Sequence, residues 1–480
     1  MTNSTLNPPA PDETLAQQIA RVAHNVHTDG LPQQIRHESA MRVLDCLGNS
    51  FAAANLRVVD QMRTIVTAWG GNDQATAINA TKTNAPNAAL LNGTMAHALD
   101  FDDTHLPSVL HPSASVVPAA IATAELTNTS GIALLDAITM GIEVTCRLGM
   151  AGYDRELGNS IFFEHGLHAT SITGTMGAAV ASAMLLGSTA DQIASALGIA
   201  ASMGAGLLEA NRTGGTVKRL HCGWAAHAGV VAAQSAHAGV TGPPTVLEGR
   251  FGFLQAYLGD RAIPSEISED LGTKWVVPGL FYKPYPCNHF THAGIDAARE
   301  LRERGITPAQ IEHITLAVPT PVLRTIAEPR KAKATPESGY HAAFSGPFTL
   351  ASAWFSDEGL GVFHEDFTDE SAMNPDRLAL AAKVTCVPSE KCDSIFPNQF
   401  PAIVTATLTD GSVHVAEVLS NRGGPERPLS DAELGIKFTK NCERTITKDH
   451  ADQIRAAVQG LASGDTTIQK LGELLKGDQQ

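Results

Sequence analysis

The sequence predicts a mostly α-helical protein: a large all-helical bundle domain with a smaller α+β domain inserted into it. Residues 13 to about 260 form one apolar, helix-spaced segment after another. Near residue 270 the segments become short and β-branched, and after RGGPERPLS (422–430) helical spacing returns. At 480 residues the chain is too long for one compact core. We therefore expect the helical domain to comprise residues 1–269 and 426–480, and the α+β domain residues 270–425.

The predicted bundle helices are rich in alanine and glycine, which let helices approach closely. Several, such as TSITGTMGAAVASAMLLG, are apolar nearly all round, which is typical of helices buried inside a bundle. Ser188 or Thr189 is expected to cap the helix that starts near residue 190. The predicted segments are 13–26, 39–54, 87–101, 114–127, 131–149, 170–187, 190–208, 221–239 and, after the inserted domain, 446–463.

The inserted domain is predicted from short segments rich in β-branched residues. The segments HITLAVPTPV, AKVTCVPS, AIVTATLTDG and SVHVAEVLS are expected to be strands, and TDGS (409–412) is a good hairpin turn between the last two. Two helices, THAGIDAARELRERG and GPFTLASAWFS, are expected among them. This mixture indicates an α+β domain.

Charge and cysteine content argue against several classes of protein. The net charge of −15 argues against a nucleic-acid partner, which would need a basic stripe. The seven cysteines are scattered without a CxxC pair, so we expect reduced thiols in a cytoplasmic protein and no structural zinc or iron–sulfur cluster. The N-terminus does not resemble a signal peptide. The apolar stretches are short and alanine-rich, which suits buried helices better than membrane spans.

The stretch HALDFDDTHLPSVLHP (97–112) contains three histidines and three aspartates. On a helix, His97, Asp100 and either Asp103 or Thr104 would share one face. Prolines in the second half prevent the helix from continuing, so His105 and His111 must lie in a loop. We therefore predict that the motif occupies the end of a buried helix and the loop beyond it, where catalytic groups are often held.

Three interpretations of this motif compete: a capped helix end with solvated charges, a metal site, and a metal-free acid–base site. The preceding helix is too apolar for a surface element. A metal site has some appeal, but no second acidic cluster exists elsewhere to complete a pair of sites. Acid–base catalysis is favoured, because histidine carries protons near neutral pH and a buried carboxylate can orient it.

Other segments must supply partner groups, and three place cations or imidazoles beside glycine or proline. Any one buried histidine is more often a satisfied core residue, but the segments are hard to dismiss together. They are FFEHGLHATSITGTMG (162–177) with His168, GGTVKRLHCGWAAHAG (214–229) with Lys218, Arg219 and His221, and FYKPYPCNHFTHAG (281–294) with Lys283, Asn288 and His289.

These stretches resemble the MmgE/PrpD family, which includes 2-methylcitrate dehydratase, cis-aconitate decarboxylase and iminodisuccinate epimerase. The matching stretches are HALDFDDTHLPSVLHPSASVVPA, GLHATSITGTMGAA, VKRLHCGWAAHAGVVAAQSAHAGVTGP with TVLEGRFGF, KPYPCNHFTHAGIDAA and GYHAAFSGPFTLASA. They occur in the family's order within residues 40 to about 445. The resemblance implies the MmgE/PrpD fold, in which the α+β domain is a lid, and also a homodimer and no cofactor.

Carried over position by position, the family's active site falls at Asp100, Thr104, His111, His168, Lys218 and Lys283. Two positions depart from the decarboxylase pattern. A catalytic histidine after the lysine of the KPYP segment is replaced by Asn288, with His289 adjacent, and a tyrosine of the inserted domain is replaced by Phe348. His105 is a further candidate for substrate binding.

The predicted enzyme is a cofactor-free lyase that acts on a small di- or tricarboxylate. Lys218, Arg219 and Lys283 would hold carboxylates, and Thr104, His105, Asn288 and His289 would contribute to substrate binding. His111 and His168 would be the acid–base pair, with Asp100 orienting His111 or binding substrate. The first expectation is a 2-methylcitrate dehydratase-like hydro-lyase. The alternatives are an epimerase or isomerase of an aspartate-like dicarboxylate, a cis-aconitate decarboxylase, and a non-catalytic carboxylate-binding protein.

Overall fold

The computed structural model describes residues 13–210, 215–356 and 359–478. The chain divides into two compact units, Met1–Leu280 with Phe438–Gln480, and Phe281–Lys437. The first unit is helical and the second combines helices with a sheet, so the predicted fold class is confirmed. The predicted domain limits at 269/270 and 425/426 stay a proposal.

The first unit consists of helices, short 3-10 helices (labelled η) and two small β-hairpins. Its elements are α1 (Leu15–Asp29), α2 (Gln33–Ala53), α3 (Arg57–Trp69), β1 (Ala75–Thr76), β2 (Lys82–Thr83), α4 (Ala85–His97), α5 (Ser113–Thr127), α6 (Gly131–Met150), β3 (Tyr153–Asp154), β4 (Asn159–Ser160), α7 (Ile161–Glu164), α8 (Ala169–Leu185), α9 (Ala190–Ala201), η1 (Val217–Leu220), α11 (His221–His237), α12 (Phe253–Leu258), η2 (Gly259–Arg261), α13 (Ser265–Ser268), η3 (Val277–Gly279), α23 (Lys448–Gln459) and α24 (Ile468–Leu475). Helix α22 (Asp431–Cys442) spans the limit between the two units.

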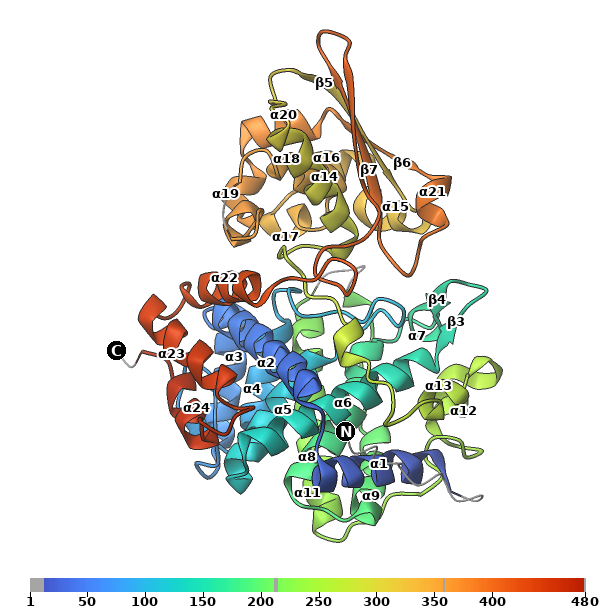
Figure 1. Cartoon of the computed structure of the whole chain (residues 1–480), viewed down its shortest axis with the longest axis vertical. Helices are drawn as coiled ribbons and strands as arrows, with labels where there is room; N and C mark the ends of the chain where they lie inside the picture. Colours follow the sequence, from blue (N-terminus) through green and yellow to red (C-terminus); the bar gives the residue numbers. More distant parts are fainter. Residues whose placement is uncertain (1–12, 211–214, 357–358, 479–480) are drawn as a thin grey trace. The chain divides into compact units, whose positions relative to one another are not determined.

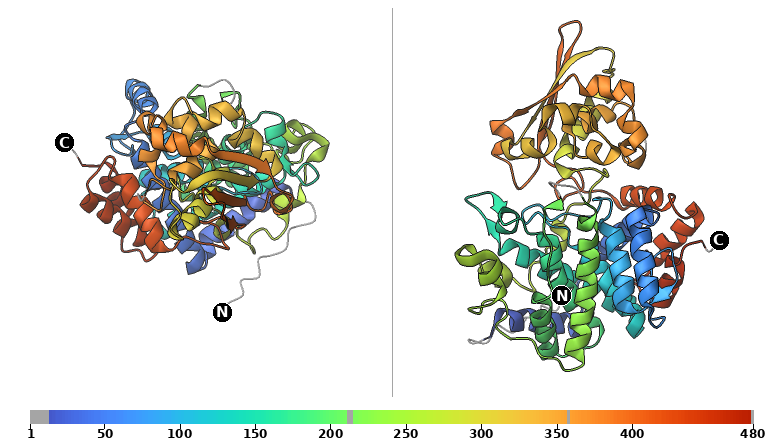
Figure 2. Two further views of the ribbon diagram at one scale, coloured as in Figure 1. Left: turned by 90° about the horizontal axis from the view of Figure 1, so that it is seen from above. Right: turned by 180° about the vertical axis from the view of Figure 1, so that it is seen from behind.

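Helix α8 forms the centre of the first unit, because every one of its residues is buried. It packs against α5, α6, α9 and α11. The C-terminal helix α23 packs against α2, and α24 packs against α5, so the two ends of the chain complete one bundle (Figure 1, Figure 2).

Small residues bring α4 and α11 close together. A Cβ atom added to Gly93 would lie 2.9 Å from the Cys222 carbonyl oxygen, and one added to Gly223 would lie 2.3 Å from the Leu90 carbonyl oxygen. Both distances are shorter than real Cβ contacts, so the two backbones can touch only because both positions are glycine. Helix α4 ends at His97 and α11 begins at His221, so this contact brings the segments of two histidines together.

The second unit is built on a four-stranded sheet of order β6-β5-β7-β8 (Figure 1). Strands β5 and β6 are parallel and the other neighbours are antiparallel; Leu316, for example, pairs with Cys386 and Val404. Its elements are η4 (His289–Thr291), α14 (His292–Glu303), β5 (Ile311–Val318), η5 (Thr320–Val322), α15 (Leu323–Ile326), α16 (Arg330–Ala334), α17 (Gly339–Ala342), α18 (Gly346–Ser352), η6 (His364–Phe367), α19 (Asp369–Ala372), α20 (Pro375–Ala381), β6 (Val384–Pro388), α21 (Glu390–Asp393), β7 (Ala402–Leu408) and β8 (Val413–Val418).

The predicted hairpin at TDGS joins β7 to β8, as expected. Strand β7 alternates between buried and half-buried residues, which is the pattern of a sheet with one face on the core. Helix α14 packs against β7 and β8, and α18 packs against β6. The core between them includes Ile314, Leu316 and Val404.

Two helix predictions need correction. The helix expected to reach residue 101 ends at His97, and the helix expected to reach residue 208 ends at Ala201. Helix α3, on which Val58, Val59 and Val66 are the buried residues, was not predicted. Of the two proposed caps, Thr189 is the residue that accepts a hydrogen bond, from the Gln192 backbone N–H.

Candidate active site

Four histidines from different segments of the first unit lie together, and we call them the histidine cluster: His97, His111, His168 and His221. The ring of His97 lies 5.4 Å from that of His111 and 5.6 Å from that of His168, measured between centroids. The rings of His168 and His221 lie 5.0 Å apart. The cluster is formed by the end of α4, the loop 98–112, the start of α8 and the start of α11.

Shortly after the end of α4 the backbone adopts a left-handed conformation at one residue. Asp100 has φ +54°, and its N–H donates to the His97 carbonyl oxygen at 3.1 Å. Aspartate tolerates this conformation better than most residues. The expected shared helix face of His97, Asp100 and Asp103 is therefore wrong, because the helix ends before Asp100. The prediction that the motif spans a helix end and a loop is confirmed.

Beyond Asp100 the loop makes a small hairpin. His105 and Leu110 form an isolated β-bridge, and Val109, at the turn, has φ +51°. A β-branched residue in this region is strained. The His105 Nδ1 atom lies 2.6 Å from the Ser108 hydroxyl, and burial lowers the His105 pKa to about 4. The contacts of His105 are thus local to the hairpin.

Asp103 ties this loop to the core. Its carboxylate accepts hydrogen bonds from the Ser113 hydroxyl at 2.6 Å and the Ser113 N–H at 3.3 Å, at the first residue of α5. The buried guanidinium of Arg42 lies 3.8 Å away and also donates to the carbonyl oxygens of Val277 and Leu280. Burial raises the pKa of Asp103 to about 6, against the opposing effects of Arg42 and Ser113.

His97 is held by the next aspartate of the motif. Its Nδ1 atom lies 2.8 Å from the Asp102 carboxylate, and each residue is only 2% exposed. The bond fixes the orientation of the ring inside the cluster. Neither residue was among the predicted site residues.

His111 is the centre of a second, more open group. Its Nδ1 atom lies 2.7 Å from the Asp103 carbonyl oxygen, and because a carbonyl only accepts, Nδ1 carries the hydrogen. Nδ1 also lies 3.3 Å from the Thr104 hydroxyl. Its Nε2 atom faces Asp100 at 3.9 Å, and the Lys218 ammonium lies 3.7 Å from the same carboxylate oxygen.

His168 and His221 form a pair through their Nδ1 atoms, which lie 2.9 Å apart. One of the two atoms must donate and the other accept, so the pair shares a single hydrogen. Burial, followed by the electrostatic effects of His97 and Lys218, lowers the His168 pKa well below its usual value. The same causes lower the His221 pKa to about 4. Both imidazoles are therefore neutral near pH 7.

The structure brings together five predicted residues: Asp100, Thr104, His111, His168 and Lys218. Arg219 lies half-buried beside Lys218 on η1. Residue 214 of that segment lies outside the described residues.

Lys283, Asn288 and His289 belong to the second unit, and their joining the histidine cluster stays a prediction. Lys283 and His289 are buried, and the rings of His289 and His292 lie 4.7 Å apart. Asn288 accepts a hydrogen bond from the Phe290 N–H and so caps η4.

His97 and His221 were named with their motifs but not chosen as site residues. A signal existed: His97 opens the histidine–aspartate motif three residues before Asp100, and His221 begins a predicted buried helix two residues after Arg219. The hydroxyl of Thr170, which accepts a hydrogen bond from the His111 N–H at 3.1 Å, was missed as a support of His111.

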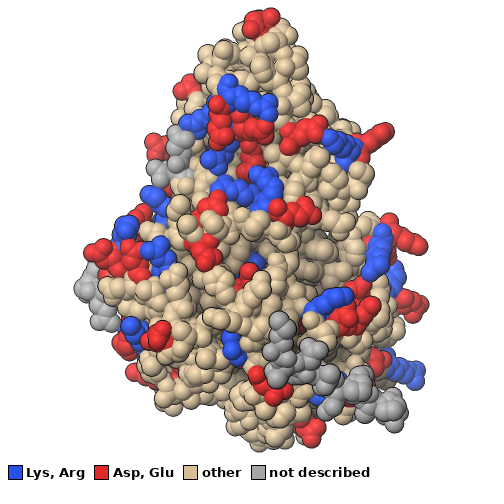
Figure 3. Space-filling view, viewed as in Figure 1, with Lys and Arg blue, Asp and Glu red and all other residues tan. Residues whose placement is uncertain are grey.

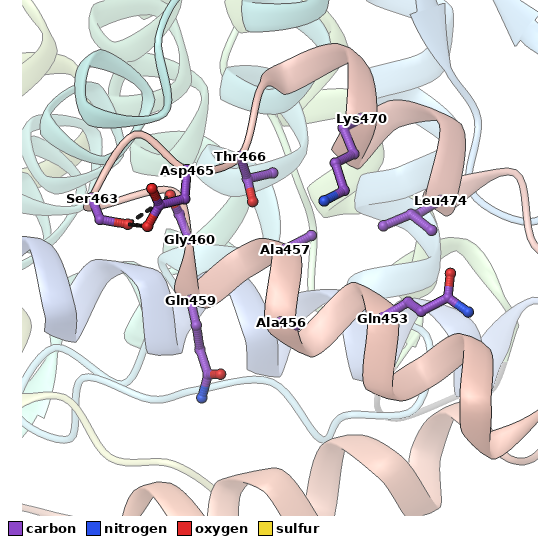
Figure 4. Close-up of a pocket in the computed structure, with 10 residues that line it drawn as sticks. All are labelled: Gln453, Ala456, Ala457, Gln459, Gly460, Ser463, Asp465, Thr466, Lys470 and Leu474. Atoms are coloured by element: carbon purple, nitrogen blue, oxygen red, sulfur yellow. Dashed lines mark hydrogen bonds between the residues drawn. The ribbon is translucent and has the colours of Figure 1, made fainter.

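Other features of the described chain lie apart from this chemistry. A pocket of about 560 Å³ lies beside α23 and α24, lined by Gln453, Asp465 and Lys470 among others (Figure 4). No histidine lines it. Acidic and basic side chains are interspersed over the face shown in Figure 3. All seven cysteines are free.

Within the described residues, no group of three or more histidine, cysteine, aspartate or glutamate side chains is arranged to hold a metal ion. Among the helices of the same residues, none combines the length and the apolar character that crossing a membrane requires.

Fold and geometry together define a helical-bundle protein with a cluster of histidine and carboxylate side chains in its interior. The MmgE/PrpD N-terminal domain model matches residues 17–266 and the MmgE/PrpD C-terminal domain model matches residues 285–463. The chain belongs to the MmgE/PrpD family, as the sequence motifs indicated.

Curated relatives cover nearly the whole chain. Human cis-aconitate decarboxylase is 29% identical over 97% of this chain and 95% of its own length. The mouse cis-aconitate decarboxylase is 28% identical over 97% of this chain and 94% of its own length. The cis-aconitate decarboxylase of Aspergillus terreus is 26% identical over 96% of each chain.

Proposed function

We propose that this protein is a lyase that transfers protons next to a carboxylate of a small di- or tricarboxylate, and that it acts as a 2-methylcitrate dehydratase-like hydro-lyase. The observation that carries the proposal is the pairing, within one cluster, of a neutral imidazole at His168 with an imidazole at His111 that faces Asp100 and Lys218. A base, an acid and a cation are the groups that such a reaction requires.

His168 supplies the base. When its Nδ1–H donates to His221, its Nε2 atom has a free lone pair, and the lowered pKa keeps it available at neutral pH. His111 supplies the acid, because its Nε2–H can form beside the Asp100 carboxylate. In the dehydration, His168 Nε2 takes the α-proton, the C–O bond breaks, and the proton of His111 Nε2 leaves with the hydroxyl as water.

Lys218 supplies the cation. In the ligand-free site its ammonium lies 3.7 Å from Asp100, which is longer than a good charge-assisted hydrogen bond. A substrate carboxylate offers a shorter contact, and the same ammonium then stabilises the enolate-like charge that develops as the α-proton leaves. We propose Arg219, Lys283, Thr104, His105, Asn288 and His289 as further substrate-binding residues.

The second candidate is cis-aconitate decarboxylation, which the curated relatives favour. Two residues of the second unit support the hydro-lyase instead. Asn288, at the position of the decarboxylase histidine, caps η4. Phe348, at the position of the decarboxylase tyrosine, is fully buried and packs with Ala342 and Ala372. An epimerase and a non-catalytic binding protein stay as further alternatives.

Proton NMR in deuterated water tests the proposal. The purified protein is incubated with 2-methylcitrate, citrate, cis-aconitate, tartrate and iminodisuccinate in turn. Loss of water from 2-methylcitrate, with solvent deuterium exchange at the α-carbon, is the expected result. Formation of carbon dioxide from cis-aconitate would select the decarboxylase, inversion of iminodisuccinate the epimerase, and binding without exchange the binding protein.

We also propose that the reaction needs no metal, since the acid, the base and the cation are all side chains of the chain. Dialysis against EDTA is expected to leave the rate unchanged. A loss of rate that Mg²⁺ or Fe²⁺ restores would contradict this and would return the metal interpretation of the motif.

A homodimer in the cytoplasm completes the proposal. The free cysteines support the reducing location. The dimer is proposed from the family resemblance, and sedimentation equilibrium measures it directly: a mass near 50.4 kDa, that of one chain, would contradict it.

A further inference from the structure

The contact between His168 and His221 links the hydrogen positions of the two rings. Their Nδ1 atoms lie 2.9 Å apart, which is the distance of a good hydrogen bond. Two Nδ1–H groups would repel each other at this distance, and two lone pairs would leave the contact without a hydrogen. In the neutral pair, one ring therefore carries its hydrogen on Nδ1 and the other carries it on Nε2.

Backbone contacts hold the two rings against each other. The His168 N–H, just before α8, donates to the Gly206 carbonyl oxygen at 3.0 Å. The Ser171 hydroxyl, in the first turn of α8, donates to the His221 carbonyl oxygen at 3.0 Å. A Cβ atom added to Gly206 would lie 3.1 Å from the His168 Cβ and 3.5 Å from the His221 Nδ1. The ring contact is therefore supported by the packing of α8, α11 and the chain at residue 206.

The exposed fractions of the two residues indicate which ring donates. The ring that donates through Nδ1 keeps a lone pair on Nε2, whereas the ring that accepts carries an Nε2–H that needs an acceptor of its own. A buried N–H group without an acceptor is costly. His221 is 8% exposed and His168 is 2% exposed, so His221 is the ring whose Nε2–H is nearer to water. This favours His168 as the donor and His221 as the acceptor.

We infer that His221 is a positioning residue: by accepting the Nδ1–H of His168, it fixes the tautomer in which His168 keeps its lone pair on Nε2. The use of that lone pair in the reaction rests on the proposed function. The position of the hydrogen does not, because it is a property of the ligand-free protein.

The tautomer decides whether His168 can act as a base through Nε2. A neutral imidazole carries one hydrogen, and the hydrogen bond made by one nitrogen determines which nitrogen carries it. In the reverse arrangement the Nε2 atom of His168 would carry the hydrogen and could not accept the α-proton of a substrate. His221 therefore acts on the reaction through His168, without a contact of its own with the reacting atoms.

The first test is nitrogen NMR of the full-length, ligand-free protein with isotopically labelled histidine, near neutral pH. The chemical shift of a ring nitrogen shows whether it carries a hydrogen. We expect the hydrogen of His168 on Nδ1, that of His221 on Nε2, and a scalar coupling between the two Nδ1 atoms across their hydrogen bond. His227 is the internal reference, because its Nδ1 atom lies 3.0 Å from the Pro86 carbonyl oxygen, which only accepts. The reverse tautomers, or no coupling, would overturn the inference.

Substitution of His221 tests the cause. His221→Leu removes the acceptor, so the hydrogen of His168 is expected to leave Nδ1 for Nε2. His221→Asn returns an acceptor, its amide oxygen, and is expected to restore the wild-type tautomer. The matched control is His227→Leu, the same substitution on α11 outside the cluster, which should leave the His168 signals in place. A His168 that keeps its hydrogen on Nδ1 in His221→Leu would overturn the inference. If that variant does not fold, the wild-type spectrum decides.

Kinetics give a second readout once a substrate is known. His221→Leu is expected to lower kcat by about 10²–10⁴-fold, as loss of the base itself would, and His221→Asn is expected to recover most of that loss. A fall in kcat while His168 keeps its wild-type tautomer would reduce His221 to a structural role and overturn the inference.

The two readouts separate this inference from the proposed function. The inferred tautomers, without proton exchange in any of the candidate acids, would contradict the proposed function alone. Turnover of 2-methylcitrate by a protein with the reverse tautomers would contradict the role of His221 alone.

Discussion

One motif of sixteen residues contains two histidine–aspartate pairs that differ in almost every physical respect. His97 and Asp102 lie 2.8 Å apart and are shut away from water. His111 and Asp100 lie 3.9 Å apart, their side chains are 13% and 18% exposed, and Lys218 approaches the same carboxylate at 3.7 Å. We call them the closed pair and the open pair.

The difference separates orientation from reaction. A short hydrogen bond that is shielded from water holds a ring in one position and leaves no room for another partner. A long, partly exposed contact is easily exchanged for a contact with substrate, and catalytic hydrogen bonds are often long before substrate binds. The closed pair therefore suits a ring held in one orientation, and the open pair suits groups that must change partners during turnover.

The largest expected effect is on the open pair. His111→Gln should lower kcat by about 10²–10⁴-fold, because it removes the general acid while the hydrogen bond to the backbone can be kept. The thermal midpoint should change little. His227→Gln is the control, since His227 is a half-buried histidine of α11 that bonds the Pro86 carbonyl oxygen outside the cluster. Turnover near that of wild type would remove His111 from the reaction.

The next effect concerns the cation of the open pair. Lys218→Met should weaken dicarboxylate binding by about 1.5–3 kcal/mol, the usual worth of a charge-assisted hydrogen bond. Its ammonium is 20% exposed and Asp100 still faces His111, so the ligand-free protein should lose little stability. Calorimetric titration with citrate and thermal melts measure both quantities. Lys448→Met, at a surface ion pair with Asp452, is the control.

If instead Lys218 is a permanent structural partner of Asp100, the mutation leaves the half-buried Asp100 carboxylate without this cation. The melting temperature would then fall without ligand, by an amount equivalent to about 3–5 kcal/mol. That result would contradict the role of Lys218 in binding.

The third prediction concerns Asp103, whose carbonyl oxygen accepts the hydrogen bond of His111 in the open pair. Its pKa is raised from 3.8 to about 6 in the folded protein, so between those values the folded state binds more protons than the unfolded state. Its contribution to stability is present below about pH 4 and is lost as the pH rises through 6. A shift of this size corresponds to about 3 kcal/mol.

Asp103→Asn abolishes this titration. Removing the carboxylate partner of Arg42 changes the free energy of unfolding by an amount that does not depend on pH. Apart from this constant change, the stability of the variant relative to wild type should rise between pH 4 and pH 6 and then level off. Urea unfolding at a series of pH values measures the slope. A difference that is flat over this range, or that falls, would show that Asp103 is ionised throughout.

The smallest effect is expected at the turn between the two halves of the loop. Val109→Gly relieves a left-handed valine, worth about 1–2 kcal/mol, but gives the unfolded chain more freedom, worth about 0.4–1 kcal/mol. A net gain in stability below about 1 kcal/mol should appear in the urea midpoint. Val231→Gly, inside α11, should instead lower the midpoint. A loss of similar size at Val109 would mean that the turn is not strained.

The sequence allowed the fold class, and most of the residues that the structure gathers in the candidate site, to be predicted for physical reasons. Helical spacing identified the bundle, and the turn TDGS identified the hairpin of β7 and β8. The prolines of the motif required a loop, which is where His111 lies. Local rules of this kind act within a few residues and can be read from the chain.

The partners within the site were beyond those rules. The Nδ1 contact of His168 with His221 joins residues far apart in the chain, and it depends on how α8 and α11 pack. The preference of His97 for Asp102 over Asp100 depends on a single left-handed residue at the helix end. For two of the predicted residues, Asp100 and Lys218, nothing in the sequence indicated that they would lie against each other.

The contact of Gly93 with α11 and of Gly223 with α4 makes the site adjustable from a distance. Helix α4 ends at His97 and α11 starts at His221, so the two glycines set the spacing between the segments that carry these histidines. Each glycine has only a hydrogen atom where another residue would have a Cβ atom, and this sets how closely the two helices can pack. Alanine at either position would push the two helices apart. Enzyme libraries should therefore leave residues 93 and 223 untouched, or vary them together to change the spacing between the segments of His97 and His221.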